Sequence, residues 1–189
     1  MINYVSYRKF ATLGNGKRVM FRVLNDQDRD ALIQLFMEAP DEDTRFLKQN
    51  VKDQKLINYW IDHINYLKVL PLVAVDLESN LLIADATLHR GKHASKHIGE
   101  IRIFVSRSAR NLGLGSLMLD ELIGMALKAG LQLLKAEVLA DHKKVIKAFK
   151  SKGFEIKATL DDYFIRKDGV THDVVLMLRP VVPKDEAVF

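Results

Sequence analysis

Two spacings of apolar residues divide the chain into predicted elements. Apolar positions three and four apart predict a helix that Asn25 or Asp26 caps and Pro40 follows, and a second helix from about Gln54 to Tyr66. After Tyr66 the spacing changes to short apolar and β-branched runs, which are typical of strands. The first predicted strands are Leu70–Asp76, Leu81–Leu88 and Ile98–Val105.

The second half of the chain alternates helices with strands. Apolar residues three and four apart from Leu114 onwards predict an amphipathic helix that Gly130 ends, and Asp141 caps the next predicted helix, which Gly153 ends. A chain of 189 residues has the length of one domain, which we expect over residues 1–180, with a loose tail at residues 181–189. The fold class is therefore mixed α/β. The remaining predicted strands are Leu131–Leu139, Phe154–Leu160 and Val170–Leu178.

Composition removes several classes of function. The chain has no cysteine, so disulfides, thiolate metal sites and a cysteine nucleophile are excluded. It begins without a secretory signal, and its longest apolar run, Val69–Val75, is too short to cross a bilayer, so we expect a cytoplasmic protein without a membrane partner. The net charge of +5 suits an anionic partner, but no base-reading motif accompanies it and nucleic acid is not expected.

The histidines do not indicate a metal site. His89, His93 and His97 are four apart, but Gly91 and the polar composition around it argue against one continuous helix that would bring them to a common face. We therefore expect no metal.

A glycine-rich segment carries the strongest chemical signal. It reads Arg110-Asn111-Leu112-Gly113-Leu114-Gly115 and lies between a predicted strand and a predicted helix. Glycine lets the backbone approach a ligand closely, and the free N–H groups at the start of a helix bind phosphate. The alternative is that Gly113 and Gly115 only form a tight turn between strand and helix.

Other motifs at this segment fail on spacing. In a dinucleotide-binding motif a third glycine would stand where the chain has Met118. A P-loop requires GxxxxGK[ST], but Gly16-Lys17 is followed by Arg18. A nucleophile elbow around Ser116 lacks its second glycine.

The segment resembles the R/Q-x-x-G-x-G/A pyrophosphate loop of the GNAT superfamily. The strand before it, the helix after it and the later segment Phe149–Glu155 follow in the order of that superfamily, and the resemblance covers roughly Val19–Leu178. Within the superfamily, the chain is most similar to the acetyltransferase domain of bacterial protein-lysine acetyltransferases. The resemblance implies a central, largely antiparallel twisted sheet flanked by helices on both faces, with a V-shaped splay near Val105 where acetyl-CoA enters.

The resemblance also implies an activity and a set of binding residues. The activity is direct transfer of an acetyl group from acetyl-CoA, a co-substrate that needs no metal, to a primary amine. The backbone of Phe104 and Val105 would pair with the pantetheine arm, and Arg110 would open the pyrophosphate loop. The backbone N–H groups expected to hold the diphosphate are those of Asn111, Leu112, Gly113, Leu114, Gly115 and Ser116.

Glu100 is the candidate for the catalytic base. It shares a strand face with Arg102 and Phe104, so one interpretation is an ion pair with Arg102. The other, which the resemblance implies, is a general base. A lysine amine with a pKa of about 10.4 is neutral in only about one molecule in 2,500 at pH 7, so the reaction needs a group that accepts its proton.

The sequence leaves the acid, the acceptor and the oligomeric state open. Phe149 stands where many members of the superfamily have the tyrosine that protonates the departing thiolate, so the acid is unassigned. The acceptor is a protein lysine or a small amine such as a polyamine, an amino acid or a drug. A catalytically silent module that binds acyl-CoA is the alternative from another class. Both a monomer and a homodimer fit the sequence.

Overall fold

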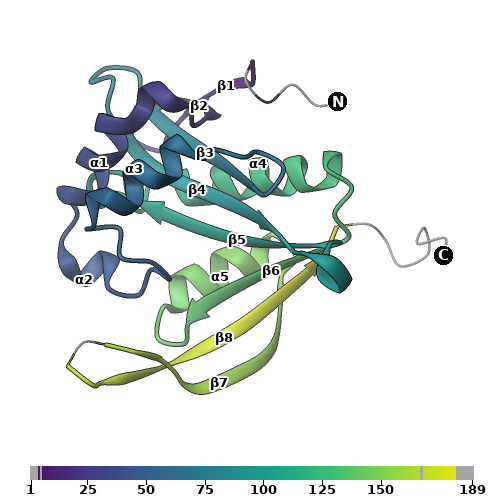
Figure 1. Ribbon diagram of the computed structural model, residues 1–189. Coiled ribbons are helices and arrows are strands. Elements are labelled where there is room, and N and C mark those ends of the chain that lie inside the picture. Colours follow the sequence, from purple (N-terminus) through teal and green to yellow (C-terminus); the bar gives the residue numbers. More distant parts are fainter. Residues whose placement is uncertain (1–3, 5, 167, 182–189) are drawn as a thin grey trace. The chain divides into compact units, whose positions relative to one another are not determined.

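The structure is a computed structural model that describes residues 4, 6–166 and 168–181 (Figure 1). Eight strands are hydrogen-bonded into one sheet in the order β1-β2-β3-β4-β5-β6-β8-β7. The strands are β1 (Arg8–Thr12), β2 (Arg18–Val23), β3 (Val69–Asp76), β4 (Leu82–Arg90), β5 (Ile98–Val105), β6 (Leu133–Leu139), β7 (Glu155–Ile165) and β8 (Thr171–Pro180). The α-helices are α1 (Arg29–Met37), α2 (Asp41–Thr44), α3 (Gln54–Asp62), α4 (Leu114–Lys128) and α5 (Lys143–Ser151).

Packing divides the chain into two compact units. The first consists of Met1–Thr87 and Ile103–Met118, and the second of Leu88–Arg102 and Leu119–Phe189. Strands β4 and β5 and helix α4 each run from one unit into the other. The single domain expected over residues 1–180 stays a prediction, and residues 182–189 of the expected tail lie outside the described residues.

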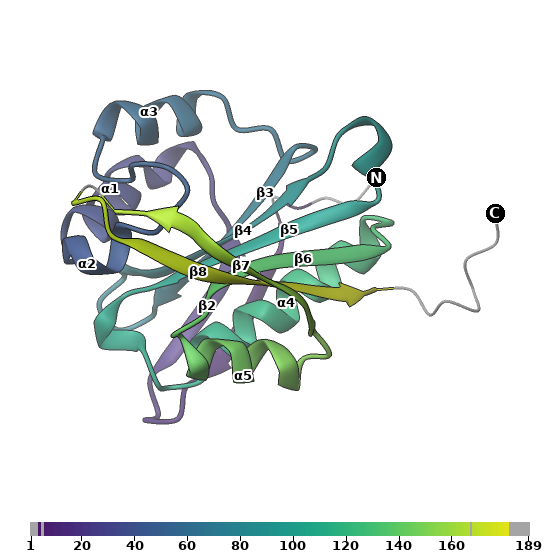
Figure 2. The same cartoon turned by 90° about the horizontal axis from the view of Figure 1, so that it is seen from below.

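In the first unit, α1 and α3 pack their apolar faces on the sheet, and Figure 2 shows both helices on the same side of β3. Asn25 begins the helical stretch with a capping box, which confirms the predicted cap. The ring of Phe36 on α1 lies 5.2 Å from that of Phe104 on β5, centroid to centroid. Buried members of this core are Leu32, Leu35, Phe36, Ile57, Ile61, Val73, Val75 and Phe104.

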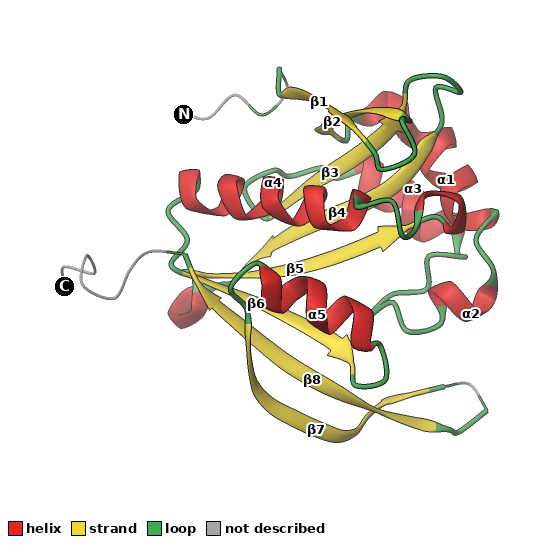
Figure 3. Ribbon diagram, turned by 180° about the vertical axis from the view of Figure 1, so that it is seen from behind, coloured by secondary structure: helices red, strands yellow, loops and turns green. Residues whose placement is uncertain are grey.

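In the second unit, α5 lies beside β6, as Figure 3 shows from behind. Phe149 on α5 is buried, and its ring meets that of Phe154 edge-on at 5.0 Å between centroids. The prediction that Asp141 caps this helix is wrong: the residue before α5 is His142, and its side chain makes no capping hydrogen bond. Other buried residues of this unit are Leu119, Leu122, Met125, Leu134, Ala136 and Met177.

The sheet is largely antiparallel, as expected, with one parallel ladder between β5 and β6. That ladder pairs Ile98–Glu100 with Leu133–Lys135, and β6 then continues to Leu139 beside β8. The pairing of β5 with β6 therefore stops at Glu100, before the position near Val105 where the resemblance placed a splay.

Gly99 offers a test of packing in the second unit. A Cβ added there would lie 2.7 Å from Cδ1 of both Leu131 and Leu88, which are buried and have no room to swing into solvent. We expect Gly99→Ala to lower the free energy of unfolding by about 1–3 kcal/mol, measured by chemical denaturation. The matched control is Gly124→Ala in α4, where the added Cβ meets nothing within 4 Å and the change should raise stability by up to about 1 kcal/mol. Equal stability of parent and Gly99→Ala would contradict this packing.

Candidate active site

The glycine-rich segment forms the connection from β5 to α4, and all of it lies in the first unit. Gly113 has φ of +85° and Asn111 has φ of 60°, both in the left-handed region. Glycine occupies that region without the strain that a Cβ brings, and a Cβ on Gly113 would meet nothing within 4 Å. The backbone at Gly113 is therefore open to a ligand.

The start of α4 presents unsatisfied donors beside this opening. Helix α4 begins at Leu114, and Leu117 N–H donates to Gly113 C=O at 3.1 Å. The N–H groups of Leu114, Gly115 and Ser116 precede that bond, so they have no acceptor within the helix. Together with the helix dipole, these donors make a seat for an anion. An open backbone and a set of unsatisfied N–H groups fit a diphosphate.

Two arginines tie the segment to α2. Asp43 on α2 has a side chain only 10% exposed, and it accepts from Arg107 Nε at 2.7 Å. It also lies 3.0 Å from Arg110 Nη2. Arg110 Nε in turn donates to Val105 C=O at 3.0 Å. The guanidinium of Arg110 is therefore engaged by Asp43 and by the Val105 carbonyl, and it links the connection to α2 and to the end of β5.

A third contact fixes the middle of the segment. Gly14, in the turn between β1 and β2, donates its N–H to Leu112 C=O at 3.2 Å. The connection is thus held at Leu112, at Arg107 and at Arg110 before any ligand binds. Such order reduces the entropy that binding would otherwise cost.

Glu100 lies in the second unit and forms an ion-pair cluster there. Its Oε1 accepts from Arg102 Nε at 2.8 Å, and its Oε2 lies 2.9 Å from Lys135 Nζ on β6. Lys135 also contacts Glu137 at 3.0 Å. Burial lowers the pKa of Lys135, but hydrogen bonds to the two glutamates outweigh it, and the net pKa is raised. The expected contact with Arg102 is present, whereas the role of Glu100 as general base stays a prediction.

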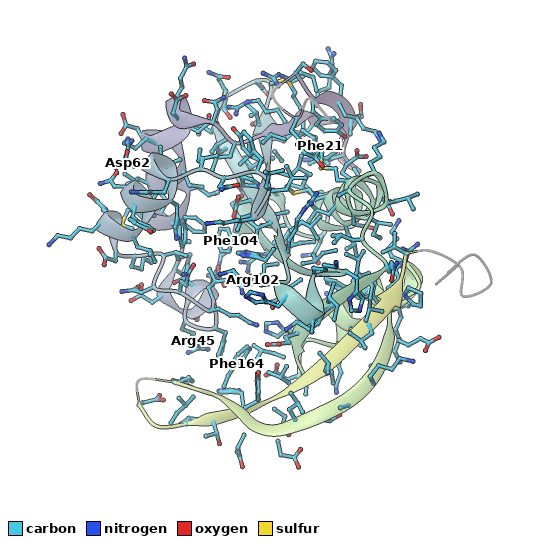
Figure 4. All side chains as sticks on the ribbon, turned by 45° about the vertical axis from the view of Figure 1, so that its right-hand side comes forward. Phe21, Arg45, Asp62, Arg102, Phe104 and Phe164 are labelled. Atoms are coloured by element: carbon cyan, nitrogen blue, oxygen red, sulfur yellow. The ribbon has the colours of Figure 1, made fainter. Side chains whose placement is uncertain are left out.

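The other predicted residues divide between backbone and core. Phe104 turns its side chain into the apolar core, so its side chain is not available to a ligand; Figure 4 labels it together with Arg102, two residues earlier on β5. The C=O of Val105 accepts from Arg110 Nε. Phe149 packs against Phe154 and offers no proton, so the acid remains unassigned.

Sequence reasoning missed two residues that these contacts bring in. Asp43 is 64 and 67 positions away from its partners Arg107 and Arg110, and Lys135 contacts Glu100 from the neighbouring strand. Neither residue belongs to a local motif, so no spacing in the sequence predicts these contacts.

The described residues contain neither a cluster of metal ligands nor a membrane-spanning helix. Between residues 4 and 181, leaving out 5 and 167, no three His, Asp or Glu side chains gather as metal ligands would. In the same residues, no helix has both the length and the apolar character needed to span a membrane.

Comparison with solved structures finds the same fold in several acetyltransferases. The GNAT domain of S. lividans PAT superposes with a TM-score of 0.74 at 21% identity, covering 92% of this chain and 96% of that one. Ribosomal-protein-alanine N-acetyltransferase from Brucella melitensis gives 0.74 at 23%, covering 85% and 98%. A phosphinothricin acetyltransferase from Sinorhizobium meliloti, in complex with AcCoA, gives 0.75 at 20%, covering 90% and 95%.

The sequence itself matches a protein family. Residues 29–154 fit the Acetyltransferase (GNAT) family, and this range contains α1, the whole connection from β5 to α4, and α5. The match spans more than half of the chain and includes the segment whose geometry suits a diphosphate. The chain therefore belongs to the GNAT family of acetyltransferases.

Proposed function

We propose that this protein transfers the acetyl group of acetyl-CoA directly to a primary amine. The observation that carries the proposal is the connection from β5 to α4, with Gly113 open to a ligand and the first N–H groups of α4 directed at it. Membership of the family supports it, and so does the AcCoA bound in the Sinorhizobium meliloti neighbour.

The proposal gives each residue of the connection a task. The backbone N–H groups from Asn111 to Ser116 hold the diphosphate of acetyl-CoA. The backbone of Phe104 and Val105 pairs with the pantetheine arm. Arg110 contributes by ordering the connection, because its guanidinium is bound by Asp43 and by the Val105 carbonyl. No metal takes part.

Two kinds of acceptor amine, a protein lysine and a small molecule, are compatible with the fold. The resemblance to bacterial protein-lysine acetyltransferases that the sequence suggests favours a protein lysine. The neighbours include enzymes named for a ribosomal-protein alanine and for phosphinothricin, so the same fold carries protein and small-molecule acceptors alike. A thiol with a pKa of about 8.5 can leave as a thiolate without a donor, so the phenylalanine at position 149 is compatible with turnover.

A substitution at Gly113 tests the seat for the diphosphate. Acetyl-CoA should raise the melting temperature of the parent, and Gly113→Glu should abolish that rise because a side chain and a negative charge would fill the seat. Gly169→Glu is the matched control: it has φ of +83° and open space, and it lies between β7 and β8. Equal shifts in the parent and in Gly113→Glu would place the diphosphate elsewhere.

A substitution at Asp43 tests whether order in the connection contributes to affinity. Asp43→Asn should raise the Kd for acetyl-CoA about 2- to 10-fold, because Arg107 and Arg110 lose the charge that orders them. Isothermal titration measures the change. The matched control is Asp41→Asn on the same helix, whose side chain is 95% exposed and should leave the Kd unchanged.

The proposal that Glu100 is the general base has a test in two variants, Glu100→Gln and Arg102→Gln. A base predicts that only Glu100→Gln lowers kcat, by about 10²–10⁴, at an unchanged melting temperature. An ion pair predicts similar losses of melting temperature from both. We expect the second result, with kcat within about tenfold of the parent, because Arg102 and Lys135 engage both carboxylate oxygens of Glu100.

A further inference from the structure

Asp85 is an acidic residue in the middle of an apolar strand. It lies on β4 between Ala84 and Ala86, which are both fully buried, while Asp85 itself is half-buried on the opposite face. A carboxylate withdrawn from water is costly unless hydrogen bonds or an opposite charge compensate it. Its surroundings therefore need an explanation.

The other withdrawn aspartates of the first unit have cationic partners. Asp28 contacts Arg22 at 2.5 Å, Asp76 contacts Lys17 at 2.8 Å, and Asp43 holds two arginines. Asp85 differs: within the part of the chain that the structure describes, it makes no hydrogen bond through its side chain and no ion pair. Burial raises the pKa of its carboxyl to about 7.

The register of β4 and β5 places Asp85 opposite Phe104. Ser106 N–H donates to Ile83 C=O at 3.0 Å, and at the other end of the two strands Gly91 N–H donates to Ile98 C=O at 2.9 Å. The strands are therefore antiparallel, and two steps along from Ile83 and Ser106 lie Asp85 and Phe104. Residues directly opposite in such a pair point to the same face of the sheet.

That face is apolar around Phe104. Phe104 packs on Phe36, and every member of its cluster is apolar. Charged or titratable groups on the same strand faces are Glu100 and Arg102 on β5 and His89 on β4, and α1 contributes only apolar side chains to the cluster. After Phe104, β5 runs within one residue to the end of the strand and into the connection that the proposed function assigns to acetyl-CoA.

We propose that Asp85 is the group that receives the acceptor amine and removes its proton, an assignment that rests on the acetyl transfer proposed above. Asp85, Phe104, Val105 and the connection to α4 belong to the same compact unit. The carboxylate thus stands on the strand next to the backbone that meets the acyl end of acetyl-CoA.

The proton and electron pairs balance in this assignment. The Asp85 carboxylate takes one proton from the ammonium of the acceptor. The freed lone pair on nitrogen forms the bond to the acetyl carbon, the bond from that carbon to sulfur breaks, and its electron pair leaves with sulfur as the thiolate. The nitrogen then gives its extra proton to the thiolate through solvent, and Asp85 returns its proton to solvent. The products are the amide, the free thiol and one proton.

Asp85 suits this task better than a carboxylate held in ion pairs. A general base works best when its pKa lies near the working pH, because it is then both ionised and able to hold a proton. Both carboxylate oxygens of Glu100 are already engaged, one by Arg102 and the other by Lys135. The unpaired carboxylate of Asp85 has no such partner among the described residues.

Kinetics of Asp85→Asn on the full chain test the assignment. The assay follows thiol release from acetyl-CoA with the fastest of three acceptors: a lysine peptide with a blocked N-terminus, a peptide with a free N-terminal alanine, and spermidine. We expect kcat to fall by about 10²–10⁴ at pH 7, with the Kd for acetyl-CoA unchanged. By pH 9 the loss should shrink about 100-fold, because each pH unit deprotonates tenfold more of the free amine.

The melting temperature distinguishes Asp85 from an aspartate whose ionised form stabilises the fold. The folded state holds the Asp85 proton up to a pH near 7, whereas an unfolded aspartate loses it near 3.8. Stability from this group is therefore present below pH 4 and is lost as the pH rises through 7. Asp85→Asn should remove that loss and melt at a higher temperature than the parent at pH 8.

Asp76→Asn is the matched control among buried aspartates. The hydrogen bond from Lys17 lowers the pKa of Asp76 although burial opposes it, so its ionised form stabilises the fold above the unfolded pKa. Asp76→Asn should therefore melt at a lower temperature than the parent at pH 8, the opposite sign to Asp85→Asn.

The possible outcomes separate the role of Asp85 from the proposed acetyl transfer. An Asp85→Asn variant with the parental rate at pH 7, a loss that does not shrink with pH, or a lower melting temperature at pH 8 would each overturn the role of Asp85. If instead the parent neither binds acetyl-CoA nor turns over any of the three acceptors, the proposed function itself fails. Retained acetyl-CoA binding in Asp85→Asn, with turnover lost and the melting temperature raised, supports both.

Discussion

A charge withdrawn from water must find an opposite charge or hydrogen bonds, and this constraint organises the polar contacts around β5. Asp43 meets it by holding two arginines, which fixes the connection to α4. Glu100 meets it with Arg102 and Lys135, which joins β5 to β6 at the last residue of their ladder. The ordered backbone of the proposed site is thus a consequence of paired charge.

Asp85 is the exception to this constraint among the described aspartates of the first unit, and the exception indicates a function. A half-buried aspartate without a partner lowers the stability of the fold at neutral pH, and proteins keep such groups mainly where chemistry needs them. Asp85 lies opposite Phe104, at the end of β5 that leads into the anion-binding connection. Rigid elements therefore surround a site whose acid group remains free to change its protonation state.

Local patterns predicted most elements but not all of them. The capping box at Asn25 and the strand Ile98–Val105 agree with the structure because their signals lie within a few residues. The strands β1 and β2 were not predicted, although Val19, Phe21 and Val23 alternate buried with less buried positions. Strand β1 is mostly exposed at the edge of the sheet, so its side chains carry little apolar signal. The cap expected at Asp141 failed because the helix begins one residue later.

The sequence by itself determined the mixed α/β class and the glycine-rich connection between β5 and α4, because glycine positions, caps and apolar spacing act over a few neighbouring residues. The sequence also shows Asp85 as an acidic residue within an apolar run, but it does not show which residues surround that carboxylate. Only the tertiary structure decided that Arg110 is held by Asp43, that Glu100 is held by Lys135, and that Asp85 lies opposite Phe104 with no partner among the described residues. The physical reason is that the pairing of charges and the register of strands join residues far apart in the chain, and no local pattern encodes which of them will meet.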